Sequence, residues 1–257
     1  KYVKTLFTKA LENNIVAIGI TDYFMIDGYK RIVTKYLQNP DKMKELFPDD
    51  IVRSQIEKIF VFPNIELRLN IFVGHNPHSI NYHVIFSNTV SPQEIEANFF
   101  GRLAFQTDIN NSFTITKENL IEYGKSIKTT KGEKGSDLLV GLNNVTVDYL
   151  KVKELLENAN FKDKYIISIP VNEDLSNISW NGRDYTTKKI LYQHATCYMT
   201  SNPGTILWAL AEGEEEERIK EIGSIKPCIW GSDAHSYERM FSPDENRFCW
   251  IKAEPSF

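Results

Sequence analysis

The chain has 257 residues, of which 42% are hydrophobic and 25% are charged, and its formal net charge is −4. This composition is typical of a globular protein, and the acidic balance excludes a global basic field that would hold nucleic acid non-specifically. Three scattered cysteines form no CxxC pair, and no signal sequence or apolar membrane span is visible. We therefore expect a cytoplasmic protein with no membrane partner.

The first part of the chain predicts a helix, a buried strand and a polar strand end. Residues 2–14 space their apolar side chains at helical intervals, and residues 16–20 form a short, continuous apolar run. Asp22 and Tyr23 follow directly, at the kind of strand end where α/β folds place their chemistry. A turn then leads into a further helix over residues 29–37.

Two strands with isolated polar residues are predicted next. Residues 58–73 alternate between apolar and polar side chains and include Glu66, while residues 81–87 run back and include His83. Taken singly, such residues are more often solvated than functional. They become candidates only if other polar strand residues converge on them.

The middle of the chain is mainly helical in pattern. Ser91 caps one helix, residues 116–123 predict a second, short helix, and residues 147–158 predict an amphipathic one. Residues 129–144 are rich in lysine, glycine and aspartate without a clear period. We expect a loop there. The alternative is a lysine-rich segment that borders a functional site.

Short strands and helices alternate in the last third as well. The pattern predicts strands over residues 165–169 and 197–201 and helices over residues 186–194 and 205–210. No internal repeat is visible. This alternation of strands and helices favours a single α/β domain, barrel-like or open, with its site at the carboxyl ends of the strands.

The final predicted strand ends in the clearest candidate site. An apolar run over residues 228–230 gives way to small residues and then to Asp233 and His235. Residues two positions apart in an extended chain point to the same side, so a carboxylate and an imidazole emerge together. Such a pair suits Zn, Mn or Fe. The alternative is a capping aspartate and a surface histidine in an ordinary turn.

Other common chemistries lack their motifs in this chain. There is no GxxxxGK[ST] phosphate loop, no GxGxxG dinucleotide turn and no GxSxG nucleophile elbow. Five candidates remain at or along predicted strands, and together they predict a metal site: Asp22, Glu66, His83, Asp233 and His235.

Several ordered motifs resemble those of the PHP (polymerase and histidinol phosphatase) family. They are Ile-Thr-Asp-Tyr at 20–23, Pro-Asn-Ile-Glu at 63–66, His-Val-Ile-Phe at 83–86 and Gly-Ser-Asp-Ala-His at 231–235. Pro-Asp-Glu-Asn-Arg-Phe at 243–248, with Ser-Asn-Pro-Gly at 201–204, is similar more narrowly to the N-terminal PHP domain of TrlF-type ATPases. In those large proteins the PHP domain precedes an SMC-like ATPase.

The resemblance implies a distorted (β/α)7 TIM-like barrel that residues 1–257 form as a single phosphoesterase domain. It also implies that the chain is a fragment of a longer protein, with its N-terminal strand missing. One to three Zn, Mn or Fe ions would activate water against a phosphate ester. The matching metal-ligand positions are Glu66, His83, Asp233 and His235, and Asp22 or Tyr23 would orient water or substrate.

The chain also departs from the family pattern. The opening His-x-His is absent, the phenol of Tyr23 stands where the family has an imidazole, and Ile169 stands where a later strand often has histidine. Two functions therefore stay open. One is a metal-dependent phosphoesterase, including a nuclease. The other is a degenerate, non-catalytic barrel that serves as a platform for an attached or partner SMC-like ATPase.

Overall fold

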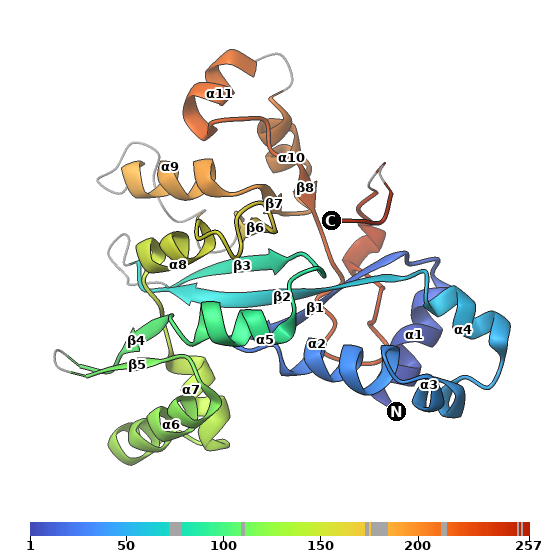
Figure 1. The fold of residues 1–257 in the computed structure, drawn as a ribbon. Coiled ribbons are helices and arrows are strands. Elements are labelled where there is room, and N and C mark those ends of the chain that lie inside the picture. The colour runs from blue at the N-terminus through green and yellow to red at the C-terminus, as the bar shows by residue number, and fades with distance from the viewer. Residues whose placement is uncertain are drawn as a thin grey trace.

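The computed structural model describes residues 1–71, 79–108, 111–172, 175, 185–211, 215–250, 252 and 254–257. In these ranges the chain is a mixed α/β structure built on a curled six-stranded sheet that forms half of a barrel (Figure 1). A small hairpin, β4 (Ala104–Gln106) and β5 (Ser112–Thr114), forms a separate sheet. Among the described helices, none combines the length and apolar character that crossing a membrane requires.

The large sheet has the strand order β1-β2-β3-β6-β7-β8. Its members are β1 (Ala17–Tyr23), β2 (Phe60–Leu69), β3 (Ile80–Phe86), β6 (Tyr165–Pro170), β7 (Cys197–Met199) and β8 (Cys228–Ile229). β3 runs antiparallel to both of its neighbours, and the other pairs are parallel. The link over residues 70–79 is shorter than the roughly dozen residues of a parallel crossover, so β3 has to run back. The α/β class is thus confirmed, but the strands are not all parallel.

Helices near the N-terminus enclose the smaller of two cores. They are α1 (Tyr2–Glu12), α2 (Asp27–Ile32) with its π-helical continuation η1 (Val33–Leu37), α3 (Pro40–Leu46) and α4 (Asp50–Ile56). Phe7 and Ala10 of α1 are fully buried and belong to the same cluster as Ile18 and Ile20 of β1. The helical spacing of these α1 residues therefore anchors the helix beside the first strand.

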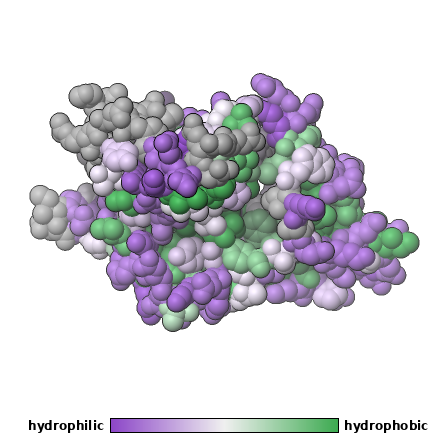
Figure 2. All heavy atoms as spheres, turned by 90° about the horizontal axis from the view of Figure 1, so that it is seen from above, coloured by the Kyte–Doolittle hydropathy of each residue, from purple (hydrophilic) through white to green (hydrophobic). Residues whose placement is uncertain are grey.

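The larger core lies mainly against β2, β3 and β6. It includes residues of η2 (Ile95–Phe100), which continues α5 (Pro92–Glu94), and of α8 (Tyr149–Leu156), α9 (Tyr185–His194), α10 (Pro203–Leu210) and α11 (Glu215–Ile222). A short 3-10 turn, η4 (Asp244–Asn246), lies near the C-terminus. Seen from above, hydrophobic residues gather near the middle of the molecule and hydrophilic ones at its margins (Figure 2).

The expected loop over residues 129–144 is wrong for most of its length. α6 (Lys117–Lys131) runs into it, and α7 (Asp137–Asn144) fills its second half. The two helices touch through glycines: a Cβ on Gly124 would lie 1.8 Å from the Asp137 carbonyl oxygen, and one on Gly141 would lie 2.0 Å from that of Leu120. These glycines allow two backbones to meet, and they do not loosen the chain.

Alternation along the strands separates two faces of the sheet. On β2, Ile65, Leu67 and Leu69 belong to the larger core, while Asn64, Glu66 and Arg68 project to the opposite side. We call this opposite side the polar face. It carries the residues that matter for a candidate site.

Candidate functional site

A row of directly paired residues crosses five strands on the polar face. Tyr23 pairs with Glu66, Glu66 with His83, His83 with Ser168, and Ser168 with Cys197. Residues paired in this way project to the same face, with neighbouring strands about 4.8 Å apart. We call these five residues the polar row. Tyr23 is the last residue of β1, so the row begins at the carboxyl end of that strand.

Glu66 and His83 are the buried titratable pair at the centre of the row. Their exposed fractions are 9% and 7%. Burial lowers the pKa of His83 to about 4, against a smaller opposing effect from the charge of Asp233. The imidazole is therefore neutral at neutral pH, which is the form that can donate a lone pair to a metal ion.

The hydrogen bonds around His83 decide which ring nitrogen carries the proton. The Asn64 amide nitrogen donates to the Thr21 hydroxyl at 2.8 Å, which leaves the Asn64 carbonyl oxygen facing Nδ1 of His83 at 3.3 Å. Because that oxygen can only accept, Nδ1 carries the proton and Nε2 keeps its lone pair. An imidazole fixed in this way by a neighbouring acceptor is the usual arrangement of a metal-binding histidine.

Tyr23 and Arg68 stand beside this pair. Burial raises the pKa of the Tyr23 phenol, and the charge of Glu66 and a hydrogen bond to its carboxylate raise it further. The Arg68 guanidinium carbon lies 5.4 Å from the centre of the Tyr23 ring. Nη1 of Arg68 donates to the Leu142 carbonyl oxygen of α7 at 2.8 Å, so that helix helps to position the cation. A carboxylate, an imidazole and a guanidinium therefore share one face.

Ser168 extends the site toward β7. The residue is fully buried, and its hydroxyl lies beside the Cys197 thiol, whose pKa burial raises and a hydrogen bond with Ser168 lowers. A thiol is a weak hydrogen-bond partner, so a bound water or ligand atom would improve the hydrogen bonding of this hydroxyl. Its register partner on the other side is His83, so the hydroxyl also lies next to the imidazole.

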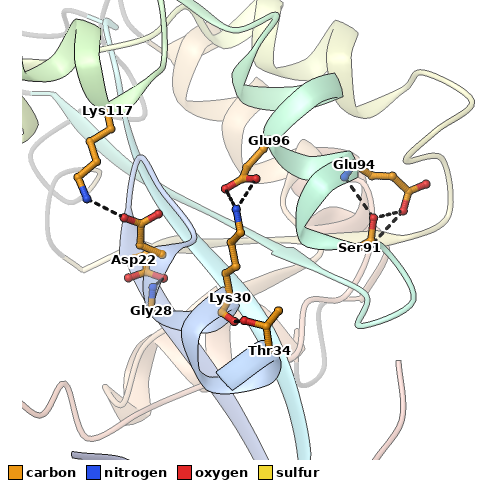
Figure 3. Close-up of polar contacts among 9 residues, drawn as sticks. Asp22, Gly28, Lys30, Thr34, Ser91, Glu94, Glu96 and Lys117 are labelled. Carbon is orange, nitrogen blue, oxygen red and sulfur yellow. Dashed lines mark hydrogen bonds and ion pairs between the residues drawn. The ribbon is translucent and has the colours of Figure 1, made fainter. Parts of the chain in front are cut away.

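Asp22 is directed to the other side of β1. Its carboxylate accepts a hydrogen bond from the backbone N–H of Gly28 at 3.0 Å (Figure 3) and one from that of Tyr29 at 3.2 Å, both at the start of α2. A Cβ at position 28 would lie 2.7 Å from this carboxylate, so the contact needs glycine. Burial raises the Asp22 pKa to about 6 even though these two bonds lower it. The structure does not bring Asp22 together with Glu66.

Asp233 and His235 follow β8 and are exposed. Their side chains are 89% and 79% accessible, and their closest mutual contact is 3.8 Å. Nδ1 of His235 lies 3.0 Å from the Asp233 carbonyl oxygen. The charge of Asp233 nevertheless raises the pKa values of His83 and Tyr23, so this carboxylate lies within electrostatic reach of the polar row.

The six residues singled out from the sequence thus divide into three groups. Tyr23, Glu66 and His83 share the polar row, Asp22 binds α2, and Asp233 with His235 lies outside the row. In the ranges that the structure describes, no three histidine, cysteine, aspartate or glutamate side chains stand close enough together to hold a metal ion. The buried pair is therefore half of the expected ligand set.

Comparisons with known proteins add little to this picture. No family model and no curated protein matches the chain. One solved structure is similar, that of a Bifidobacterium adolescentis protein described provisionally as a metal-dependent phosphoesterase. The identity is 11%, the match covers 95% of this chain and 86% of the other, and the TM-score is 0.37. A similarity of this size carries no argument, so the case for a site rests on this chain's own residues.

Asn64, Arg68 and Ser168 were missed by the sequence analysis. Asn64 and Arg68 lie two residues before and after Glu66. The three polar residues alternate with Ile65, Leu67 and Leu69. This strict alternation was a visible signal that all three polar residues share a face. Ser168 gave no comparable signal, because its role follows from its register with His83.

Proposed function

We propose that the chain catalyses metal-dependent hydrolysis of a phosphate ester at the polar row. One observation carries the proposal: Asn64 and Thr21 hold His83 with a free lone pair on Nε2, directly beside the buried carboxylate of Glu66. A neutral imidazole next to a carboxylate is a donor pair suited to Zn, Mn or Fe. The proposal implies a distorted (β/α)7 barrel of the PHP type.

The residues present fit a divalent ion in part. Glu66 and His83 would supply two donors, and Asp233 and His235 would add two more from the segment after β8. Such an ion lowers the pKa of a bound water and neutralises charge on phosphate oxygens. One to three ions would be held in the complete site.

The other side chains of the face have separate tasks in the proposed reaction. Arg68 would bind a phosphate oxygen, because a guanidinium has five N–H donors and the Leu142 carbonyl oxygen accepts from only one of its nitrogens in the described structure. Tyr23, hydrogen bonded to Glu66, would orient that carboxylate and the attacking water. Asp22 would act indirectly, by fixing the end of β1 to α2. The substrate would be a phosphate monoester or a diester such as nucleic acid.

The test is metal content together with hydrolysis. Protein purified without chelator is analysed for Zn, Mn and Fe before and after supplementation, and then assayed with p-nitrophenyl phosphate and bis(p-nitrophenyl) phosphate. Glu66→Gln and His83→Gln should lose bound metal and at least about a hundredfold in rate, as expected when a ligand is removed. Glu57→Gln makes the same chemical change at an exposed helix end and should change neither value.

The opposite outcome has a clear meaning. If the wild-type protein retains no metal even after supplementation, hydrolysis at this site is excluded. The polar row would then belong to a non-catalytic domain, and a platform for an SMC-like ATPase becomes the function to test, by co-purification with such an ATPase.

A further inference from the structure

A cavity lies between α8 and α9, on the side of the sheet opposite to the polar row. Its volume is about 570 Å³. Four aliphatic residues line it, namely Ile71, Leu150, Ile190 and Leu191, together with Lys153 and His194. Tyr82, whose hydroxyl contacts His194, precedes His83 in β3 and therefore projects to the other side of the sheet. The sheet thus separates this α8–α9 cavity from the candidate catalytic face.

His194 is held rigidly at the edge of the cavity by two tyrosines. Its ring stacks on Tyr82 with an interplanar angle of 13° and meets Tyr149 edge-on at 88°. Its Nδ1 lies 2.8 Å from the Tyr82 hydroxyl. Burial raises the pKa of this phenol far above its ordinary value, so the hydroxyl keeps its proton. In the ring tautomer that accepts this phenol proton at Nδ1, the imidazole carries its own proton on Nε2, which can donate to a ligand.

The lining combines an exposed apolar surface with one cationic side chain. Leu150 and Ile190 are 69% and 44% exposed although both are large and aliphatic. Among the described residues that line the cavity, Lys153 is the charged one, and its partner Glu157 lies 3.6 Å away across one helical turn. Such an exposed ion pair is weak, so the ammonium can also serve a second anion.

The charged residues of a neighbouring cavity influence where the anionic group of a ligand can bind. His194 lines it too, together with Glu157, Asp163 and Lys162. Two carboxylates against one ammonium make this lining net negative, so it disfavours an anion relative to the α8–α9 cavity, whose described lining carries Lys153 alone. A negatively charged group is therefore favoured between Lys153 and His194, and the rest of the ligand is left to the aliphatic surface.

We propose that the α8–α9 cavity binds an aliphatic monocarboxylate. The carboxylate accepts hydrogen bonds from Nε2–H of His194 and from the Lys153 ammonium. The chain of the ligand covers Leu150, Ile190, Ile71 and Leu191. This site is independent of the proposed hydrolysis, since it shares no side chain with the polar row and needs no metal.

The experiment is calorimetric titration of the whole chain with hexanoate, octanoate and decanoate below their micellar concentrations. Each added methylene should tighten binding by up to about fourfold, because each buries further apolar area against the aliphatic residues. Decanol should bind about tenfold more weakly than decanoate, since it lacks the charge that Lys153 and His194 recognise. The His194 ring signals should shift on titration in NMR spectra.

Two matched variants test the head-group contact. Lys153→Met should weaken decanoate binding about tenfold and leave decanol binding unchanged. Lys151→Met makes the same change on the same helix at an ion pair with Glu154, outside the cavity lining, and should bind decanoate like the wild type. Absent binding of decanoate, equal affinity for decanol, or equal losses in the two variants would each overturn the proposal.

Discussion

Glu66 and His83 are direct register partners across the antiparallel pair of β2 and β3, and both are buried. This pairing places a carboxylate against an imidazole that burial keeps neutral. Tyr23 is hydrogen bonded to the Glu66 carboxylate and Asn64 faces the imidazole, and a bound cation would add compensation for the buried negative charge. The exposed pair formed by Asp233 and His235 lies under no such constraint.

That difference yields a first prediction. His235→Ala should leave the free energy of unfolding within about 0.5 kcal/mol of wild type, because the side chain is exposed. Asp233→Ala should lower it by about 1 kcal/mol at most, because residue 233 has a φ of 42°, which aspartate tolerates better than alanine. If they complete the metal site, the same variants should lose bound metal and hydrolysis. Chemical denaturation and elemental analysis on the same samples separate the two effects. Full activity in either variant would remove that residue from the ligand set.

Tyr23 supplies a second prediction. Its hydroxyl is hydrogen bonded to Glu66, whereas an imidazole at that position would add a metal donor beside the same carboxylate. Tyr23→His should therefore raise the metal content per chain after supplementation. Tyr23→Phe removes the hydroxyl without adding a donor and serves as the control. Equal metal content in the histidine and phenylalanine variants would argue against a ligand position at residue 23.

Much of the fold could be predicted from local pattern. The apolar run over residues 16–20 and the alternation over residues 58–73 marked β1 and β2, because the period of side chains follows directly from backbone geometry. The alternation around Glu66 also held enough information to place Asn64 and Arg68 beside it. Local pattern could not predict the register between β2, β3 and β6. That register places Glu66 opposite His83 and Ser168 next to the imidazole.

Strand alternation places Asp22 and Tyr23 on opposite faces of β1, although the sequence analysis considered both for one role. That alternation is a local property, whereas the contacts made by the next residues are not. Gly124 and Gly141 weakened the helical pattern, yet they are needed where α6 meets α7. The contact between Tyr82 and His194 joins residues 112 positions apart, and no local pattern marks it.

The raised pKa of Asp22 predicts how stability depends on pH. Its value is about 6 in the folded chain against an ordinary 3.8, so the folded state binds more protons between these values. The free energy of unfolding should therefore fall as pH rises from about 4 to 6, by at most about 3 kcal/mol. Asp22→Asn keeps an acceptor for Gly28 and Tyr29 and should remove this slope.

Urea unfolding at pH 4.5 and pH 7 measures the Asp22 effect. The variant should be more stable than wild type at pH 7 and nearly equal to it at pH 4.5. Asp41→Asn, at an exposed position in the first turn of α3, is the matched control. A pH slope that persists in Asp22→Asn, or disappears in Asp41→Asn, would contradict the assignment to Asp22.

Gly124 gives the last prediction, on the packing of α6 against α7. A methyl group there would stand 1.8 Å from the Asp137 carbonyl oxygen, and because that atom belongs to a backbone, the helices must separate. Gly124→Ala should therefore lower the free energy of unfolding by about 2 to 4 kcal/mol, although alanine favours helices. Gly231→Ala, where no atom lies within 4 Å of the added Cβ, should change it by less than about 1 kcal/mol. Because Arg68 is bonded to Leu142 of α7, the Gly124 variant should also weaken phosphate binding at the polar row. Unchanged stability in Gly124→Ala would mean that the two helices do not pack through these glycines.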